Sequence, residues 1–182
     1  FYGCKSLQGT NFDYTNGAYI LPAKKLTDSC YSHMFTDCSS SDENVFESVI
    51  LSINNVETIA GSCYYNMFKN TGIVDASGIK FGNTTSNYCY YGMFDSCKSL
   101  TTAPALPATT LAPSCYEYMF QNCSKLNYIK AMFTTTPGTS YTRSWVQSVA
   151  SSGTFVKNSR ATWTTTGNNA IPSGWTTQTA SS

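Results

Sequence analysis

The chain has 182 residues, a formal net charge of +1, 12% charged residues and 14% aromatic residues. This low and balanced charge excludes the basic face on which nucleic-acid binding depends. No run approaches the roughly 18 apolar residues that cross a bilayer, so the sequence predicts no membrane-spanning segment.

A nine-residue phrase, Cys-Tyr-x-x-Met-Phe-x-x-Cys, recurs along the chain. Copies begin at Cys30, Cys63, Cys89 and Cys115, with Thr71 in place of the last Cys of the second copy, and residues 1–4 match the end of another. Aligned on Phe, the copies lie 34, 33, 26 and 26 residues apart, so the unit has 26 residues and the longer steps carry insertions of seven or eight. Repetition at this spacing predicts a solenoid. Because the chain begins in mid-phrase, we expect further repeats N-terminal to Phe1.

Each unit is expected to contain a short helix and a short strand. Apolar residues at phrase positions 1, 5, 6 and 9 form one stripe of a two-turn helix, and a serine before most copies suits its N-cap. The proline-rich segment 100–107 predicts an extended strand in the clearest unit. Helices need more room than strands, so the solenoid should curve with its strands inside. The Phe residues of the phrase should align in one stack: Phe35, Phe68, Phe94 and Phe120.

One unit reads Phe-x-x-Cys-x-x-Leu, then an extended Leu-Pro segment, then a second Phe-x-x-Cys. This order resembles the BspA-like leucine-rich repeats of bacterial surface proteins. The resemblance covers about residues 1–133, although Cys-Tyr stands where the family has Ile-Gly, and Met-Phe where it has Ala-Phe. It implies an α/β repeat fold, a curved leucine-rich-repeat solenoid of about five units with the first incomplete. It also implies an extracellular, cell-surface role in adhesion or ligand capture without catalysis. No binding residue carries over, because the shared positions are core ones.

Residues 134–182 are predicted to form an aromatic cap on the last unit. Two strands are expected nearby, at 128–133 and 153–157, and a helix at 142–150. All three tryptophans of the chain lie in this segment: Trp145, Trp163 and Trp175. Packing over the open end is the favoured role for them, and a Trp-lined sugar site is the alternative.

The eight cysteines are predicted to be buried, reduced thiols. Eight helical residues would separate the two Cys of one phrase by about 12 Å along the axis, whereas a disulfide needs Cα atoms within about 7 Å. Equivalent Cys in neighbouring helices would also be too far apart. If the helix ends early, the pairs Cys30–Cys38, Cys89–Cys97 and Cys115–Cys123 become the alternative, leaving Cys4 and Cys63 unpaired.

Catalytic and metal sites find little support in the sequence. His33 is the only histidine, so Cys30–His33 or Cys38–His33 would be the one candidate thiol site. Cys30, His33 and Cys38 have the residue types of a zinc site, but the other copies do not keep the histidine. The acidic residues Asp42, Glu43, Glu47 and Glu57 leave a secreted hydrolase as a remote alternative. We expect no enzyme activity, no cofactor and no metal.

The predicted function is binding of a host or neighbouring-cell protein or glycan. Tyrosine offers contact area at low entropic cost. Tyr65, Tyr91 and Tyr118 recur between the fixed letters of the phrase, close to the fixed Tyr64, Tyr90 and Tyr116. In the competing interpretation, half of these tyrosines only pack against the next repeat. The insertions at about 11–18 and 40–47 are further candidates. A structural spacer, or the receptor-binding part of a phage tail fibre, is the alternative function.

Overall fold

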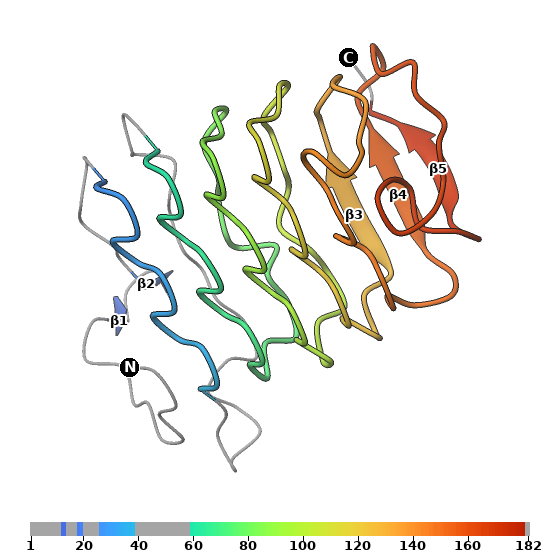
Figure 1. Ribbon diagram of the computed structural model, residues 1–182. Coiled ribbons are helices and arrows are strands. Elements are labelled where there is room, and N and C mark those ends of the chain that lie inside the picture. The colour runs from blue at the N-terminus through green and yellow to red at the C-terminus, as the bar shows by residue number, and fades with distance from the viewer. Residues whose placement is uncertain (1–11, 14–17, 20–25, 39–58, 181–182) are drawn as a thin grey trace.

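The computed structural model describes residues 12–13, 18–19, 26–38 and 59–180 (Figure 1). Within these residues the chain winds in coils that lie side by side in chain order. The insertion at 40–47 and the acidic residues at 42, 43, 47 and 57 lie outside the described residues, as does Cys4. The insertion at 11–18 is described only where β1 (Phe12–Asp13) pairs antiparallel with β2 (Ala18–Tyr19).

The phrase folds as a series of tight turns. The described residues contain no helix, so the predicted two-turn helix is wrong at every copy that the structure describes. The copies form the turn segments 28–37, 61–70, 87–96 and 113–122, and a fifth segment covers 143–148. We call these five segments the turn column. Turns follow one another closely, as where Met67 N–H donates to Tyr64 O at 3.2 Å and Lys69 N–H to Asn66 O at 3.1 Å.

Every fourth residue of a turn segment has a positive φ. In segment 61–70 these are Ser62, Asn66 and Asn70, with φ of 53°, 51° and 55°. Each is the third residue of a turn, the position where a type II turn requires positive φ and favours Gly or Asn. Gly92 and Asn122 occupy such positions in later segments. The chain therefore reverses direction locally every four residues instead of closing 3.6-residue helical turns.

The alternate amides join each coil to the next. Phe35 N–H donates to Met67 O, Phe68 N–H to Met93 O and Phe94 N–H to Met119 O, each at 2.9 Å. All of these bonds run in the same sense, from one coil to the following one. Because both sides of a coil then stack at sheet-like distances, the reason for curvature that we gave above, wide helices beside narrow strands, does not apply.

The predicted phenylalanine stack is confirmed. The ring centroids of Phe35 and Phe68 lie 5.3 Å apart, those of Phe68 and Phe94 5.6 Å, and those of Phe94 and Phe120 5.7 Å, with interplanar angles of 9°, 10° and 13°. Met67, Met93 and Met119 are fully buried beside them. One continuous core thus runs through the coils.

The opposite side of the coils is extended. β3 (Tyr128–Ala131), β4 (Thr154–Lys157) and β5 (Thr176–Thr179) form a parallel sheet in that order. Parallel bridges from Asp75 to Thr102 and from Thr102 to Tyr128 extend the same ladder into earlier coils. The strands predicted at 128–133 and 153–157 are confirmed. The leucine-rich-repeat classification and the division at 133/134 stay predictions, and the stacking of coils continues across that boundary.

The last coils enclose the three tryptophans. The helix predicted at 142–150 is wrong, because these residues form the fifth turn segment, with Trp145 where earlier copies have Met. Trp145 Nε1 donates to Ala170 O at 2.9 Å and Trp175 Nε1 to Ala150 O at 2.7 Å, and Trp163 stacks on Phe133 at 5.3 Å. All three indoles are buried, which leaves no open ring face for the alternative sugar site.

A loop after β4 closes the turn column. Val146 N–H donates to Asn168 O at 3.2 Å, and Ser144 N–H to Asn169 Oδ1 at 2.7 Å. In the earlier turn segments, the equivalent amides donate to carbonyl oxygens of the following coil. The loop thus satisfies the amides of Ser144 and Val146 much as a capping residue satisfies the first amides of a helix.

Candidate functional site

The six predicted tyrosines divide into two groups of three, and one group belongs to the core. Tyr64, Tyr90 and Tyr116 point inward and stack at 5.7 Å between successive rings. Their burial removes them from the predicted partner-binding set, because a partner cannot reach them. Desolvation raises the pKa of all three phenols. The hydroxyls of Tyr90 and Tyr116 have no hydrogen-bond partner, and nothing in the structure explains tyrosine in place of phenylalanine there.

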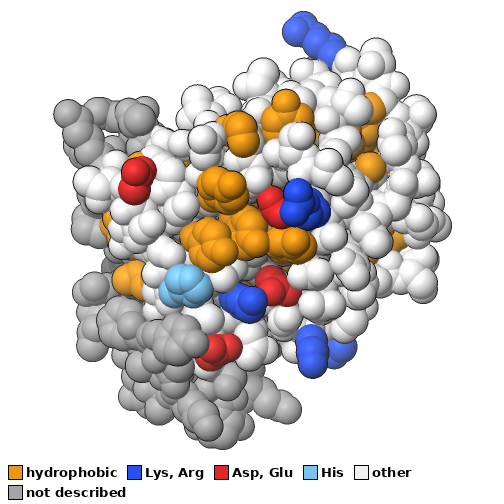
Figure 2. Space-filling model, viewed as in Figure 1, with side chains coloured by type: hydrophobic (Ala, Val, Ile, Leu, Met, Phe, Trp, Pro, Cys, Tyr) orange, Lys and Arg blue, Asp and Glu red, His pale blue; other side chains and the backbone are white. Residues whose placement is uncertain are grey.

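The other three, Tyr65, Tyr91 and Tyr118, are half-buried. The stacking of the coils brings their rings together, although Tyr118 lies one phrase position after the other two. Tyr65 and Tyr91 stack face to face at 4.4 Å and 7°, and Tyr118 meets Tyr91 edge to face at 5.2 Å and 78°. His33 lies 5.5 Å from Tyr65, and Tyr88, which is 44% exposed, lies 6.0 Å from Tyr91. We call these five residues the aromatic face. Figure 2 shows hydrophobic side chains gathered on this side of the molecule, with the single histidine beside them.

A glycine and an asparagine support the centre of the aromatic face. Gly92 has a φ of 55°, and a Cβ there would collide with Asn66 Oδ1. Asn66 is buried although it is polar. The missing side chain of Gly92 therefore leaves the space that the Asn66 amide occupies, directly after Tyr65 and Tyr91 in their coils.

The charged side chains next to the aromatic face are paired. Lys69 Nζ lies 2.9 Å from Asp95 Oδ2, and Arg143 Nε lies 3.4 Å from Glu117 Oε1. Desolvation, followed by the nearby Tyr65, raises the pKa of the Tyr91 phenol. The site therefore offers ring edges and hydroxyls, and Lys69 and Arg143 each have an opposite charge beside them.

The phrase cysteines of the later coils are buried thiols, as predicted. Cys97 Sγ donates to Phe68 O at 3.0 Å, and Cys123 Sγ to Phe94 O at 3.1 Å. Thr71, in the same column, donates its hydroxyl to Phe68 O at 2.9 Å, which shows how threonine replaces cysteine in one copy. Disulfides within a phrase are not formed at Cys89–Cys97 or Cys115–Cys123.

We expect stability to fall as the pH rises above about 8.5, where an unfolded thiol ionises. Desolvation raises the pKa of Cys63 and Cys115 to about 12 and that of Cys97 to about 11. Below pH about 8.5 both states keep these protons. Above it, the unfolded chain loses protons that the folded chain retains, so unfolding becomes more favourable up to pH about 11–12.

Urea unfolding at pH 7, 9 and 10 under reducing conditions measures this decline. The variant Cys97→Thr, which copies Thr71, should decline less because one such thiol is gone. A free energy of unfolding that stays constant from pH 7 to 10 would contradict the expectation.

The residues of the candidate thiol and metal sites differ in exposure. Cys30 is exposed, which departs from the predicted burial of the cysteines, whereas Cys38 is buried. The His33 ring packs against the Tyr65 ring, and His33 Nδ1 lies 3.3 Å from the hydroxyl oxygen of Thr36. In the part of the chain that the structure describes, no three His, Cys, Asp or Glu side chains are grouped as metal ligands would be.

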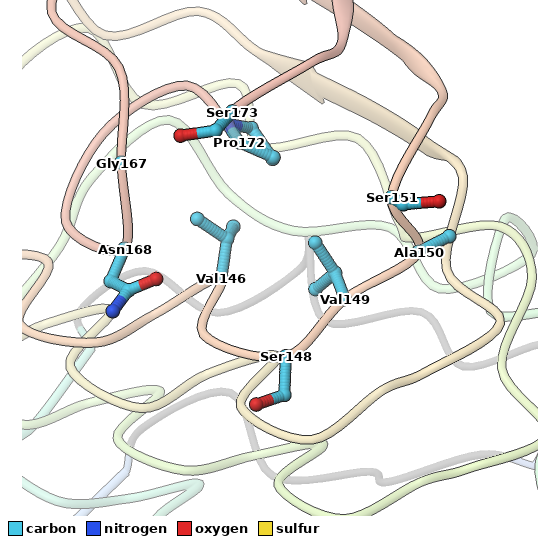
Figure 3. A pocket seen from close by; sticks show the side chains of 9 residues that line it. All are labelled: Val146, Ser148, Val149, Ala150, Ser151, Gly167, Asn168, Pro172 and Ser173. Atoms are coloured by element: carbon cyan, nitrogen blue, oxygen red, sulfur yellow. The ribbon is translucent and has the colours of Figure 1, made fainter.

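Two hollows lie near the last coils. A cleft of about 140 Å³ contains Val146 and Val149 near its centre, and Figure 3 shows its lining: Val146, Ser148, Val149, Ala150, Ser151, Gly167, Asn168, Pro172 and Ser173. It is smaller than the roughly 300–1,000 Å³ of typical ligand pockets, and no charged side chain lines it. An open groove of about 400 Å³ is lined by Ser96, Lys98, Asn122, Ser124 and Ser148. Neither contains a nucleophile with an adjacent base.

The chain matches no protein-family model, and no curated protein or solved structure matches it significantly. Among the described residues there is no helix with the length and apolar character to cross a membrane. Among the residues that the structure describes, the aromatic face is the best-defined candidate site.

Proposed function

We propose that the chain is a non-enzymatic binding module that acts outside the cell and holds a protein or glycan partner through the aromatic face. The observation that carries this proposal is the row of half-buried rings Tyr65, Tyr91 and Tyr118 on consecutive coils. The extracellular setting rests on the resemblance of the phrase to BspA-like leucine-rich repeats alone. Aromatic side chains, tyrosine and tryptophan above all, are enriched among residues that dominate binding energy.

The frame behind these rings suits recognition because it is fixed before a partner arrives. The backbone beside these rings is hydrogen-bonded to the neighbouring coil. Asn66 N–H donates to Tyr91 O and Gly92 N–H donates to Glu117 O, both at 2.8 Å. Ring contacts hold the side chains as well. Little conformational entropy remains to be lost on binding, which is the main benefit of a preorganised site.

The geometry also says how a partner would be contacted. The facing surfaces of Tyr65 and Tyr91 cover each other at 4.4 Å, so the partner meets ring edges and hydroxyls instead of a flat ring surface. Tyr88 is the most exposed of the tyrosines in the aromatic face. A partner with hydrogen-bonding groups spaced along the coil direction fits this arrangement better than one that is purely apolar.

We expect the double variant Tyr65→Ser, Tyr91→Ser to bind target cells or arrayed glycans at least tenfold more weakly than the unmodified chain, because truncated hot-spot residues cost about 2 kcal/mol or more. Fluorescently labelled protein on bacterial cells, epithelial cells and a glycan array gives the measurement. Circular dichroism checks that the variant remains folded.

The matched control is Tyr128→Ser, which removes an exposed tyrosine on β3, away from the aromatic face. It should bind like the unmodified chain. If both variants bind equally well to every target that the unmodified chain recognises, the aromatic face is not the binding site. Loss of binding by both would point to another surface, and no binding by the unmodified chain would favour the spacer.

A further inference from the structure

We propose that Cys30 and Cys63 are a disulfide-forming pair, at which a low-molecular-weight disulfide acts as oxidant and links two coils of the turn column covalently. This is independent of what the aromatic face binds. It assigns a modification site to the one copy of the phrase whose first cysteine is exposed among those that the structure describes.

The two cysteines are in register. Each is the first residue of its phrase, and the backbone around them is hydrogen-bonded between the coils: Ser29 N–H donates to Gly61 O at 3.0 Å and Tyr31 N–H to Cys63 O at 2.9 Å. The rings of the next residues, Tyr31 and Tyr64, stack at 5.8 Å and 14°. The two thiols therefore belong to the same column of the stack.

The spacing of the coils lies within the range for a disulfide. The spacing of the two coils is indicated by the ring centroids in register, 5.8 Å apart at Tyr31–Tyr64 and 5.3 Å apart at Phe35–Phe68, and by the direct hydrogen bond from Tyr31 N–H to Cys63 O at 2.9 Å. A disulfide joins Cα atoms about 4.4–6.8 Å apart. Our objection to a bond between equivalent cysteines assumed the distance between packed helices, and it does not hold for coils that stack as these do.

Accessibility distinguishes this pair from the others in register. Cys30 is exposed, whereas Cys63, Cys89 and Cys115, which continue the same column, are fully buried. An oxidant in solution can reach Cys30 and cannot reach Cys89 or Cys115. The reaction therefore begins at Cys30, and Cys63 is the nearest thiol in its column.

The chemistry is thiol–disulfide exchange in two steps. Cys30 loses its proton and its sulfur attacks one sulfur of the oxidant, whose S–S bond breaks and whose other half leaves as a thiol. Cys63, whose pKa is raised by burial, then loses its proton in the slower step and attacks Cys30 Sγ. This attack forms the Cys30–Cys63 bond and releases the second half as a thiol. The two cysteines together lose two electrons and two protons, and the oxidant gains both.

Oxidised glutathione is the probe, in a Cys4→Ser background so that the reaction is confined to described cysteines. We expect the intact mass to fall by two hydrogens and peptide mapping to find Cys30 linked to Cys63. The linked protein should melt about 5–10 °C higher than the reduced one, and dithiothreitol should reverse the shift. The proposal is overturned if the product keeps a glutathionyl group on Cys30, if Cys30 stays reduced, or if Cys63 joins Cys89.

Single substitutions separate the two steps. Cys63→Ser should stop at one glutathionyl group on Cys30, and Cys30→Ser should not react. The control Cys97→Thr removes a buried thiol from the other cysteine column and should still form the Cys30–Cys63 bond. Glutathionylation of Cys63 in the Cys30→Ser variant would show that Cys63 is reached directly and would overturn the proposed order.

Discussion

Replacing Phe94 with alanine is expected to lower the free energy of unfolding by about 3–5 kcal/mol. Phe94 is fully buried and stacks on Phe68 at 5.6 Å and on Phe120 at 5.7 Å. Main-chain hydrogen bonds hold the coils on both sides in register, so they cannot close over the cavity. Urea unfolding followed by circular dichroism measures the loss.

Two further variants interpret that result. Tyr128→Ala removes an exposed ring and should change the free energy of unfolding by no more than about 0.5 kcal/mol. Phe94→Leu, which keeps most of the volume, should fall between the two. A loss at Phe94→Ala as small as that at Tyr128→Ala would contradict the role of the phenylalanine stack in the core.

Gly153→Ala is expected to destabilise the fold by about 2–3 kcal/mol. A Cβ at Gly153 would lie 2.5 Å from Asn127 O and 2.8 Å from the Trp175 ring. Neither neighbour can move easily, because Asn127 O accepts from Thr154 N–H at 2.8 Å and Trp175 is buried. The change should therefore force β3 and β4 apart at their first residues.

Gly72→Ala is the matched control for Gly153. A Cβ at Gly72 meets nothing within 4 Å, so this variant should be as stable as the unmodified chain or slightly more stable. Thermal melts of the two alanine variants side by side test the argument. Equal melting temperatures would show that the contacts of Gly153 relax without cost.

The sequence was sufficient to predict how the coils are aligned, because the 26-residue step places Phe68, Phe94 and Phe120 at one position of the unit. The same step also leads from Phe120 to Val146, and from Met119 to Trp145. That signal of a further turn segment was overlooked, because neither residue resembles the phrase. Size and hydrophobicity at the position mattered more than residue identity.

The secondary structure of the phrase was harder to predict because its apolar pattern fits two conformations. Apolar residues at positions 1, 5, 6 and 9 line one side of a helix, and they equally line one side of a chain that turns every four residues. The residues at position 4 of the phrase distinguish the helix from the chain of turns. Asn66 and Gly92 stand there, and both favour positive φ, as do the residues at position 8. His33 and Tyr118 at the same position hide the pattern.

The candidate site, like the secondary structure of the phrase, could be predicted only in part from the sequence. The recurrence of tyrosine identified Tyr65, Tyr91 and Tyr118 but missed Tyr88 and His33 of the aromatic face. It also did not say which of the six predicted tyrosines would be buried. In a helix, neighbouring residues such as Tyr64 and Tyr65 would both lie near one side. In the turn column they point to opposite sides, with Tyr64 in the core and Tyr65 on the surface.

The uniform sense of the inter-coil hydrogen bonds gives the stack an electrical direction. Each coil donates to its successor, so the peptide dipoles of alternate residues add along the stack as they do along a helix axis. The end near Val146 carries the donor groups and hence partial positive charge, which the acceptor oxygens of Asn168 and Asn169 offset. A second copy cannot lengthen the turn column at this end, because the donors of Ser144 and Val146 are already bound by the loop.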